Sequence, residues 1–287
     1  MFFLCIMENQ EITKVTNNKL AKIFSYSLKE FSPFYKSGNK AIYNVNCLEM
    51  LPFFPEDSID MIFADPPYML SNNGFTCQNG KIANVNKGKW DKSKGFEADI
   101  DFHNEWISAC RRILKPEGTI WISGTYHNIY QCGYLLQKNM FHILNDIAWF
   151  KPNASPNLSC RFFTASHETL IWARKDKKAK HTFNYDKMKN GLFPEDKLKK
   201  ENTQMRSVWS IPTPGNGEKE YGKHPTQKPL DLLKRIVLAS TKENDIVLDP
   251  FCGSGTTGAA CMCYNNRSFI GIEIDKDFCE LVKKRLS

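Results

Sequence analysis

The sequence reads Asp245-Ile246-Val247-Leu248-Asp249-Pro250-Phe251-Cys252-Gly253-Ser254-Gly255-Thr256-Thr257-Gly258 near its carboxyl end. The first five residues form a short, apolar, β-branched run, which is typical of a buried strand. A glycine-rich turn follows, and we expect a helix from about Thr256 to Tyr264. This order is the layout of a loop that holds a nucleotide cofactor, because glycines let the backbone approach a ligand closely. It indicates an α/β fold.

Two kinds of nucleotide site can be compared with this loop. It is not a phosphate-binding P-loop, since no G-K-S or G-K-T ends it. Gly253, Gly255 and Gly258 fit the dinucleotide spacing G-x-G-x-x-G if the last glycine lies inside the helix, so a dinucleotide oxidoreductase is one alternative. The next expected strand, Ser268 to Ile272, is followed by Glu273. An acidic residue in this place can bind ribose hydroxyls.

A second informative stretch is Asp65-Pro66-Pro67-Tyr68, which follows the apolar run Ile59 to Ala64. We expect that run to be a buried strand, and ligands of open α/β sheets bind at the carboxyl ends of strands. Asp65 can accept a hydrogen bond from an exocyclic amine, and a proline-fixed turn can aim a backbone carbonyl at the second proton. Tyr68 can stack on the base. The plain alternative is an ordinary turn that ends a strand.

Together, DPPY and DPFCGSGTTG resemble two motifs of the DNA amino-methyltransferases that use S-adenosylmethionine. In that family the first motif holds the target amine and the second holds the cofactor. DPPY comes first here, as in the β group of the family, and HPTQKP at residues 224–229 matches the segment upstream of the glycine loop. The resemblance covers about residues 40 to 287. FADPPYMLSNNGF, NVNKGKWDK and NLSCRFFTASHETLIWARK are most similar to the second adenine methylases of GATC-specific restriction systems.

The resemblance implies which residues form the site. Asp65, Pro66, Pro67 and Tyr68 are expected to be catalytic. The residues expected to hold S-adenosylmethionine are Asn46, Cys47, Asp65, His224, Thr226, Gln227, Lys228, Asp249, Phe251, Gly253, Ser254, Gly255, Thr256 and Glu273. Many relatives have Asp in place of Asn46, so we expect altered cofactor affinity. A structural turn is an equally good interpretation of His224 and Lys228. No metal site is expected, since the ten cysteines include no C-x-x-C pair.

The resemblance predicts a site-specific DNA methyltransferase that modifies the N6 amine of adenine, within a restriction-modification system and at GATC. N4-cytosine methylation is an alternative that uses the same amine chemistry, although Asp at the first motif position favours adenine. Carbon-5 cytosine methylation is disfavoured, because no Pro is directly followed by Cys. A DNA-binding protein that keeps the fold without turnover is a further alternative.

The positive charge of the chain is concentrated in two segments. The formal net charge is +8; residues 174–200 hold ten Lys or Arg and four acids, and residues 69–95 hold five lysines and one Asp. Basic segments suit phosphate contacts, although lysine-rich loops are more often simply solvated. Because both flank the catalytic half in the sequence, we expect them to contact double-stranded DNA. Single-stranded DNA is a further candidate substrate.

The expected fold is a Rossmann-like, mostly parallel twisted sheet with helices on both faces. We also expect a short helix near residues 18–29 and an amphipathic helix from Phe102 to Leu114, which a turn at residues 115–118 ends. We divide the chain into an N-terminal extension (1–38), a catalytic half (39–174) with a mobile flap (69–95), a target-recognition region (175–220) and a cofactor-binding half (221–287). No apolar run is long enough to span a membrane. The start, at Met1 or Met7, lacks the features of a signal peptide. We expect a cytoplasmic enzyme that forms a homodimer and acts separately from a cognate restriction endonuclease.

Overall fold

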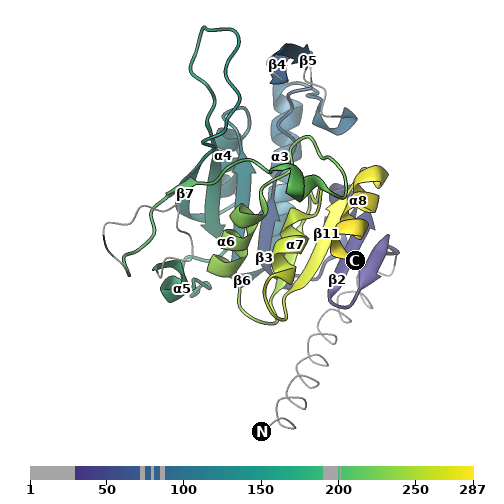
Figure 1. Ribbon diagram of the computed structural model, residues 1–287. Coiled ribbons are helices and arrows are strands. Elements are labelled where there is room, and N and C mark those ends of the chain that lie inside the picture. Colours follow the sequence, from purple (N-terminus) through teal and green to yellow (C-terminus); the bar gives the residue numbers. More distant parts are fainter. Residues whose placement is uncertain (1–29, 72–74, 79–80, 85–87, 190–199, 201) are drawn as a thin grey trace.

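The computed structural model of the protein describes residues 30–71, 75–78, 81–84, 88–189, 200 and 202–287. In this part of the chain a nine-stranded sheet lies between two layers of helices (Figure 1). The α/β class expected from the sequence is confirmed. The helix expected near residues 18–29 lies outside the described residues.

The strand order of the sheet is β1-β2-β11-β10-β3-β6-β8-β7-β9. These strands are β1 (Tyr35–Ser37), β2 (Lys40–Asn44), β3 (Ile59–Ala64), β6 (Leu114–Gly124), β7 (His142–Phe150), β8 (His167–Arg174), β9 (Val208–Ser210), β10 (Ile246–Asp249) and β11 (Ser268–Glu273). The five strands from β2 to β6 in this order run parallel. β1 and β8 run antiparallel to their neighbours, and β9 is parallel to β7.

At the centre of the sheet, the connections that leave β10 and β3 run in opposite directions. From β10 the chain crosses to β11 on one side, whereas from β3 it crosses to β6 on the other side. Neither crossover therefore covers the carboxyl ends of β10 and β3. Ligands of open α/β sheets bind at such a place.

Helices cover both faces, and β2 shows how the sequence assigns them. Ala41 and Tyr43 pack on the first face with α2 (Cys47–Met50), α3 (Phe96–Ile113) and α4 (Ile129–Lys138). Ile42 points to the second face with α6 (Leu230–Ser240), α7 (Thr256–Met262) and α8 (Lys276–Leu286). Successive strand residues alternate between faces, so a strand buried on both sides is apolar throughout. None of the described helices has the length and apolar character needed to cross a membrane.

Some boundaries differ from those that the sequence indicated. β3 matches its expected range, but α3 begins at Phe96 rather than Phe102. Its first turn is largely exposed and so shows no apolar period; the Asp99 carboxylate holds it by accepting from Ser93 Oγ and Lys94 N. The expected turn at residues 115–118 lies inside β6, where the register with β3 is irregular.

Two expected insertions are described in part. The segment 69–95 contains the hairpin of β4 (Phe75–Gln78) and β5 (Lys81–Asn84) and the short helix η2 (Lys89–Asp91). The segment 175–220 contains α5 (Tyr185–Lys189), β9 and the short helix η3 (Asn216–Lys219), and β9 extends the sheet edge. Residues 35–37, at the end of the expected N-terminal extension, form the opposite edge strand. Another short helix, η1 (Leu51–Phe53), follows α2.

The described part of the basic segment, residues 174–189, begins at the far edge of the sheet from the site. Arg174 pairs with Thr119 in the middle of β6, whereas Thr169 pairs with Gly124 at its carboxyl end, so β8 runs away from that end. The chain therefore leaves β8 at the sheet edge opposite to the carboxyl ends of the parallel strands. α5 lies at that lower edge in Figure 1, and β4 and β5 rise at the upper one. Proximity in sequence to the catalytic half did not imply proximity in space, because β8 runs antiparallel.

Candidate functional site

One cavity of about 560 Å³ opens at the carboxyl ends of β3, β10 and β11. Every residue that the sequence predicted for the site lines it, with the exception of Gly255. Gly255 has φ of +74°, and a Cβ there would meet the Val282 side chain at 2.7 Å. Its place in the loop is therefore explained by the left-handed backbone and by close packing against α8.

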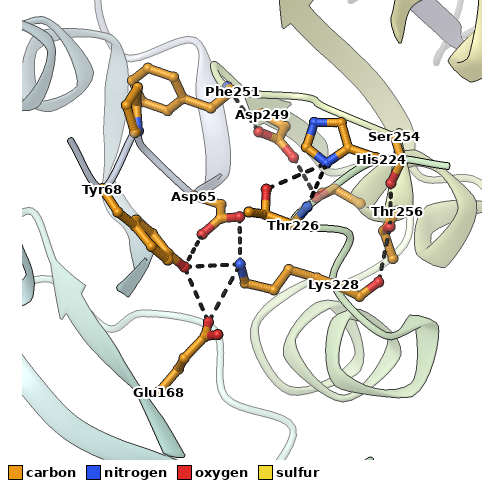
Figure 2. A network of polar contacts seen from close by, with 12 residues as sticks. Asp65, Tyr68, Glu168, His224, Thr226, Lys228, Asp249, Phe251, Ser254 and Thr256 are labelled. Atoms are coloured by element: carbon orange, nitrogen blue, oxygen red, sulfur yellow. Dashed lines mark hydrogen bonds and ion pairs between the residues drawn. The ribbon is translucent and has the colours of Figure 1, made fainter. Parts of the chain in front are cut away.

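On the side of β3, four polar side chains form a connected cluster (Figure 2). The Lys228 ammonium lies 2.5 Å from Asp65 Oδ2, 3.0 Å from the Tyr68 hydroxyl and 3.5 Å from Glu168 Oε2. The Tyr68 hydroxyl is 2.7 Å from Asp65 Oδ1 and 3.1 Å from Glu168 Oε2. Lys151 donates to the other oxygen of Glu168 at 3.1 Å. We call Asp65, Tyr68, Glu168 and Lys228 the acidic cluster.

Charges within this cluster control its protonation. Burial raises the pKa of Asp65; the Lys228 ammonium opposes that rise, and Glu168 adds to it. Burial also disfavours ionised Glu168, but Lys228 and Lys151 outweigh this and lower its pKa to about 2. Burial disfavours the charged form of Lys228, yet Asp65 and Glu168 raise its pKa. The ammonium and Glu168 are thus both charged, while Asp65 has a pKa above its ordinary value.

A buried carboxylate outside the predicted site shapes the turn after Asp65. Asp91 Oδ1 accepts from the backbone amides of Tyr68 and Met69, both at 2.9 Å. Its Oδ2 accepts from Leu70 N at 3.2 Å and from Ser71 Oγ at 2.9 Å. Asp91 is fully buried. One signal could have identified it: Asp91 is the single acid in the lysine-rich segment 69–95.

The glycine loop lies on the other side of the cavity. Asp249 accepts from Phe251 N at 3.0 Å and from Thr257 Oγ1 at 2.5 Å, so it ties the start of the loop to the first turn of α7. Gly253 has φ of +51°, and a Cβ there would approach the His224 ring to 3.2 Å. The positive φ and the short distance to the His224 ring thus both favour glycine at this position. Burial raises the pKa of Asp249 to about 7.

Glu273 connects the glycine loop to the end of β11. Its Oε2 accepts from Gly253 N at 2.7 Å, and its Oε1 accepts from Asp275 N at 2.9 Å. Each carboxylate oxygen has a second lone pair, so the group can also accept hydrogen bonds from a ligand. Burial raises the pKa of Glu273 to about 7.

Several predicted residues also make hydrogen bonds that hold the local backbone. Asn46 caps α2, with its Oδ1 accepting from Leu48 N at 3.1 Å, and His224 Nδ1 accepts from Thr226 N at 3.3 Å. Gln227 donates to Glu218 O at 2.7 Å. These contacts give the segment 224–228 a structural role in addition to its place in the cavity wall. Lys228 differs, because its ammonium contacts the other three members of the acidic cluster.

Glu168 was absent from the prediction, although it completes the acidic cluster. It lies in β8, one hundred residues beyond Tyr68, and the pairing of Gly124 with Thr169 brings it beside Tyr68 and Lys228. Its signal in the sequence was weak: an acidic residue two positions before the apolar run Leu170 to Ala173.

The sequence profile of a DNA methylase family matches residues 59–284. The chain belongs to this DNA methylase family. Among curated proteins, the methylase is 52% identical to the Type II methyltransferase M2.MboI of Moraxella bovis, over 88% of this chain and 90% of that protein. It is 48% identical to the Type II methyltransferase M2.DpnII of Streptococcus pneumoniae, over 88% of this chain and 92% of that protein.

Solved structures agree with this membership. The crystal structure of the M1.HpyAVI–SAM complex matches the methylase with a TM-score of 0.62 and 32% identity, over 86% of this chain and 99% of that one. The PvuII DNA methyltransferase, described as cytosine-N4-specific, matches with a TM-score of 0.67. At 20% identity, over 90% of this chain and 89% of that one, this second likeness shows the fold alone.

Proposed function

We propose that the methylase transfers the methyl group of S-adenosylmethionine to the N6 amine of adenine in DNA, as the modification enzyme of a restriction-modification system. One observation carries this proposal. The Asp65 carboxylate and the Gly253–Glu273 pair face the same cavity from the ends of neighbouring parallel strands. An amine acceptor and a nucleoside-binding loop are thus placed on opposite sides of one reaction space.

The residues around the glycine loop fit S-adenosylmethionine. Glu273 offers a buried carboxylate for ribose hydroxyls, and Phe102, Phe251 and Ile274 give the cavity an apolar wall for an adenine ring. Residues 224–228 and Asn46 complete this side. When bound, the cofactor supplies a methyl group activated by a sulfonium. The protein supplies the positioning, which accounts for much of the acceleration of a two-reactant step.

The turn at residues 65–68 fits an exocyclic amine. A target base in a duplex must be flipped out of the stack to reach the cavity. Its amine is a weak nucleophile because the ring withdraws the nitrogen lone pair. Hydrogen bonds from its two protons to Asp65 and to the Pro66 carbonyl favour a tetrahedral nitrogen and release that lone pair. Tyr68 lines the cavity beside Asp65, where its ring is placed to stack on the base. No covalent enzyme intermediate is needed.

Adenine is preferred to cytosine as the target, and GATC is the proposed recognition sequence. Asp65 at the first motif position favours adenine, and the similarity to M2.MboI and M2.DpnII extends over most of the chain. N4-cytosine methylation is the second candidate, because Asp65 and Pro66 accept from any exocyclic amine. A cytoplasmic location, a homodimer and a separately acting endonuclease are part of the same proposal.

DNA is proposed to lie across the upper edge of the sheet. Lys92 and Lys94 are exposed there and line the cavity. The loop 151–166 between β7 and β8, which is the tall teal loop in Figure 1, carries Arg161, Phe162 and Phe163. Phe163 is 97% exposed, and Asn157 stiffens the loop by donating to Phe162 O at 2.7 Å. Aromatic rings beside a cation suit stacking on bases and contact with phosphates.

The first test compares the wild type with Asp65→Ala. Labelled methyl transfer from S-adenosylmethionine is measured on GATC-containing and GATC-free duplexes, and the nucleosides are then identified by mass spectrometry. We expect N6-methyladenine only in the GATC duplex and a loss of transfer in Asp65→Ala. Asp277→Ala, which changes an exposed residue of α8, is the matched control and should retain activity. Methylcytosine as the product would overturn the adenine assignment.

A further inference from the structure

Lys228 comes from the segment that the sequence assigned to the cofactor, but its ammonium lies on the side of the target base. It is held by Asp65, Tyr68 and Glu168, and the residue is only 6% exposed. Its backbone faces the other way, since Lys228 O accepts from Thr256 Oγ1 at 3.2 Å in the glycine-loop helix. One residue thus connects the two halves of the site, as Figure 2 shows.

The charges around Lys228 are balanced. A buried ammonium is costly unless it is paired and hydrogen-bonded. Two carboxylates, Asp65 and Glu168, face Lys228, and Lys151 donates to the second oxygen of Glu168. The two acids and two lysines sum to zero formal charge. Removing any one of them leaves the group with an uncompensated charge.

We propose that Lys228 and Glu168 are positioning residues for methyl transfer. Lys228 holds Asp65 ionised and fixes one of its oxygens, while Glu168 holds Lys228 and the Tyr68 hydroxyl in place. Each Asp65 oxygen keeps a second lone pair for the target amine. This inference rests on the proposed function, because it assigns both residues to the step in which the amine is held by Asp65.

Lys228 and Glu168 have opposite effects on the pKa of Asp65: Lys228 lowers it and Glu168 raises it. Four groups face Asp65: Lys228 from the segment before α6, Tyr68 from its own turn, Glu168 from β8 and Asp249 from β10. Without Lys228, Asp65 faces two carboxylates, and its proton is held to higher pH. Without the charge of Glu168, repulsion falls and Asp65 ionises at lower pH. A protonated Asp65 has less capacity to accept from the amine, so activity falls as pH falls through the pKa of Asp65.

The test is the pH dependence of single-turnover methyl transfer in Lys228→Met, Glu168→Gln and the double variant. We expect the acid limb to move up by about one to three pH units in Lys228→Met, as for loss of an opposite charge within a few ångströms. It should move down in Glu168→Gln and return towards the wild type in the double variant. The matched control is Lys234→Met, which changes a lysine paired with Asp231 on the exposed side of α6. Its acid limb should stay at the wild-type pH. Rate losses with unmoved limbs, or displacements of the same sign, would overturn the inference.

A second measurement separates this inference from the proposed function. The Asp65 carboxyl is titrated by carbon-13 NMR in the folded wild type and in each variant, with Asp65→Asn used to assign the signal. Opposite displacements of the Asp65 pKa in Lys228→Met and Glu168→Gln support the positioning roles. An unmoved pKa contradicts them. If the wild type transfers no methyl group to any DNA, the proposed function fails, and this titration still decides the charge coupling.

Discussion

At the scale of single residues, the site depends on buried carboxylates in different electrostatic surroundings. Glu168 has two lysines within reach and a pKa lowered to about 2. Glu273 accepts only backbone amides among its described hydrogen bonds, and burial raises its pKa to about 7. The same functional group is therefore permanently charged in one place and titrates near neutrality in the other.

Glu273→Gln should weaken S-adenosylmethionine binding by about 10- to 100-fold, since a hydrogen bond to a charged group contributes about 1.5–3 kcal/mol. Because the raised pKa leaves Glu273 largely protonated below about pH 7, wild-type affinity should rise from pH 6 to pH 8. The variant should show a smaller rise, because Asp249 in the same cavity still titrates in this range. Calorimetric titration at both pH values checks this, with Glu280→Gln on α8 as the control. Equal pH dependence in both proteins would contradict the role of Glu273.

At the scale of elements, the turn after β3 is held from outside its own sequence. Prolines restrict residues 66 and 67, but the next amides depend on the carboxylate of Asp91 in η2. The described residues at the end of the segment 69–95 are therefore tied to the catalytic turn. The expected mobile flap has at least one fixed point.

Asp91→Ala should loosen residues 68–71, because three backbone amides and a hydroxyl lose their acceptor. We expect methyl transfer to fall about 100-fold, the effect of displacing a reacting group by about 1 Å. Hydrogen exchange at Met69 and Leu70 should become faster, while exchange in β10 and β11 stays slow. Asp186→Ala in α5, whose side chain is 82% exposed, is the control. Unchanged exchange at Met69 would show that the turn holds itself.

At the scale of the whole molecule, the sheet separates two basic surfaces. Lys92 and Lys94 lie beside the cavity at one edge, whereas Lys177 and Lys178 follow β8 at the opposite edge. Both pairs are exposed and carry the same charge. Only the first pair lies on the surface proposed to meet DNA.

The salt dependence of DNA binding distinguishes the two surfaces. Replacing Lys92 and Lys94 by Gln should reduce the slope of log affinity against log salt by about 0.9 for each phosphate that the protein no longer neutralises. The same change at Lys177 and Lys178 should leave the slope nearly unchanged. Fluorescence anisotropy over a salt series measures both. Equal reductions would indicate that the total charge, rather than its position, governs binding.

The sequence alone determined what is encoded over a few neighbouring residues. The apolar run Ile59 to Ala64 and the loop 249–255 were correctly placed, because alternation, β-branching and glycine act locally on the backbone. The motifs at 65–68 and 249–258 indicated the family, which the comparisons confirm. They also identified residues that the structure brings to one cavity.

Only the tertiary structure decided how distant charges meet. Lys228 is 163 positions from Asp65. Glu168 lies on β8, and neither motif predicts the antiparallel register of that strand. That same register carries residues 174–189 away from the cavity, although they follow the catalytic half in sequence. Asp91 reaches the catalytic turn across an intervening hairpin. Strand order and direction set these contacts, because they depend on how the whole sheet assembles and not on any local pattern.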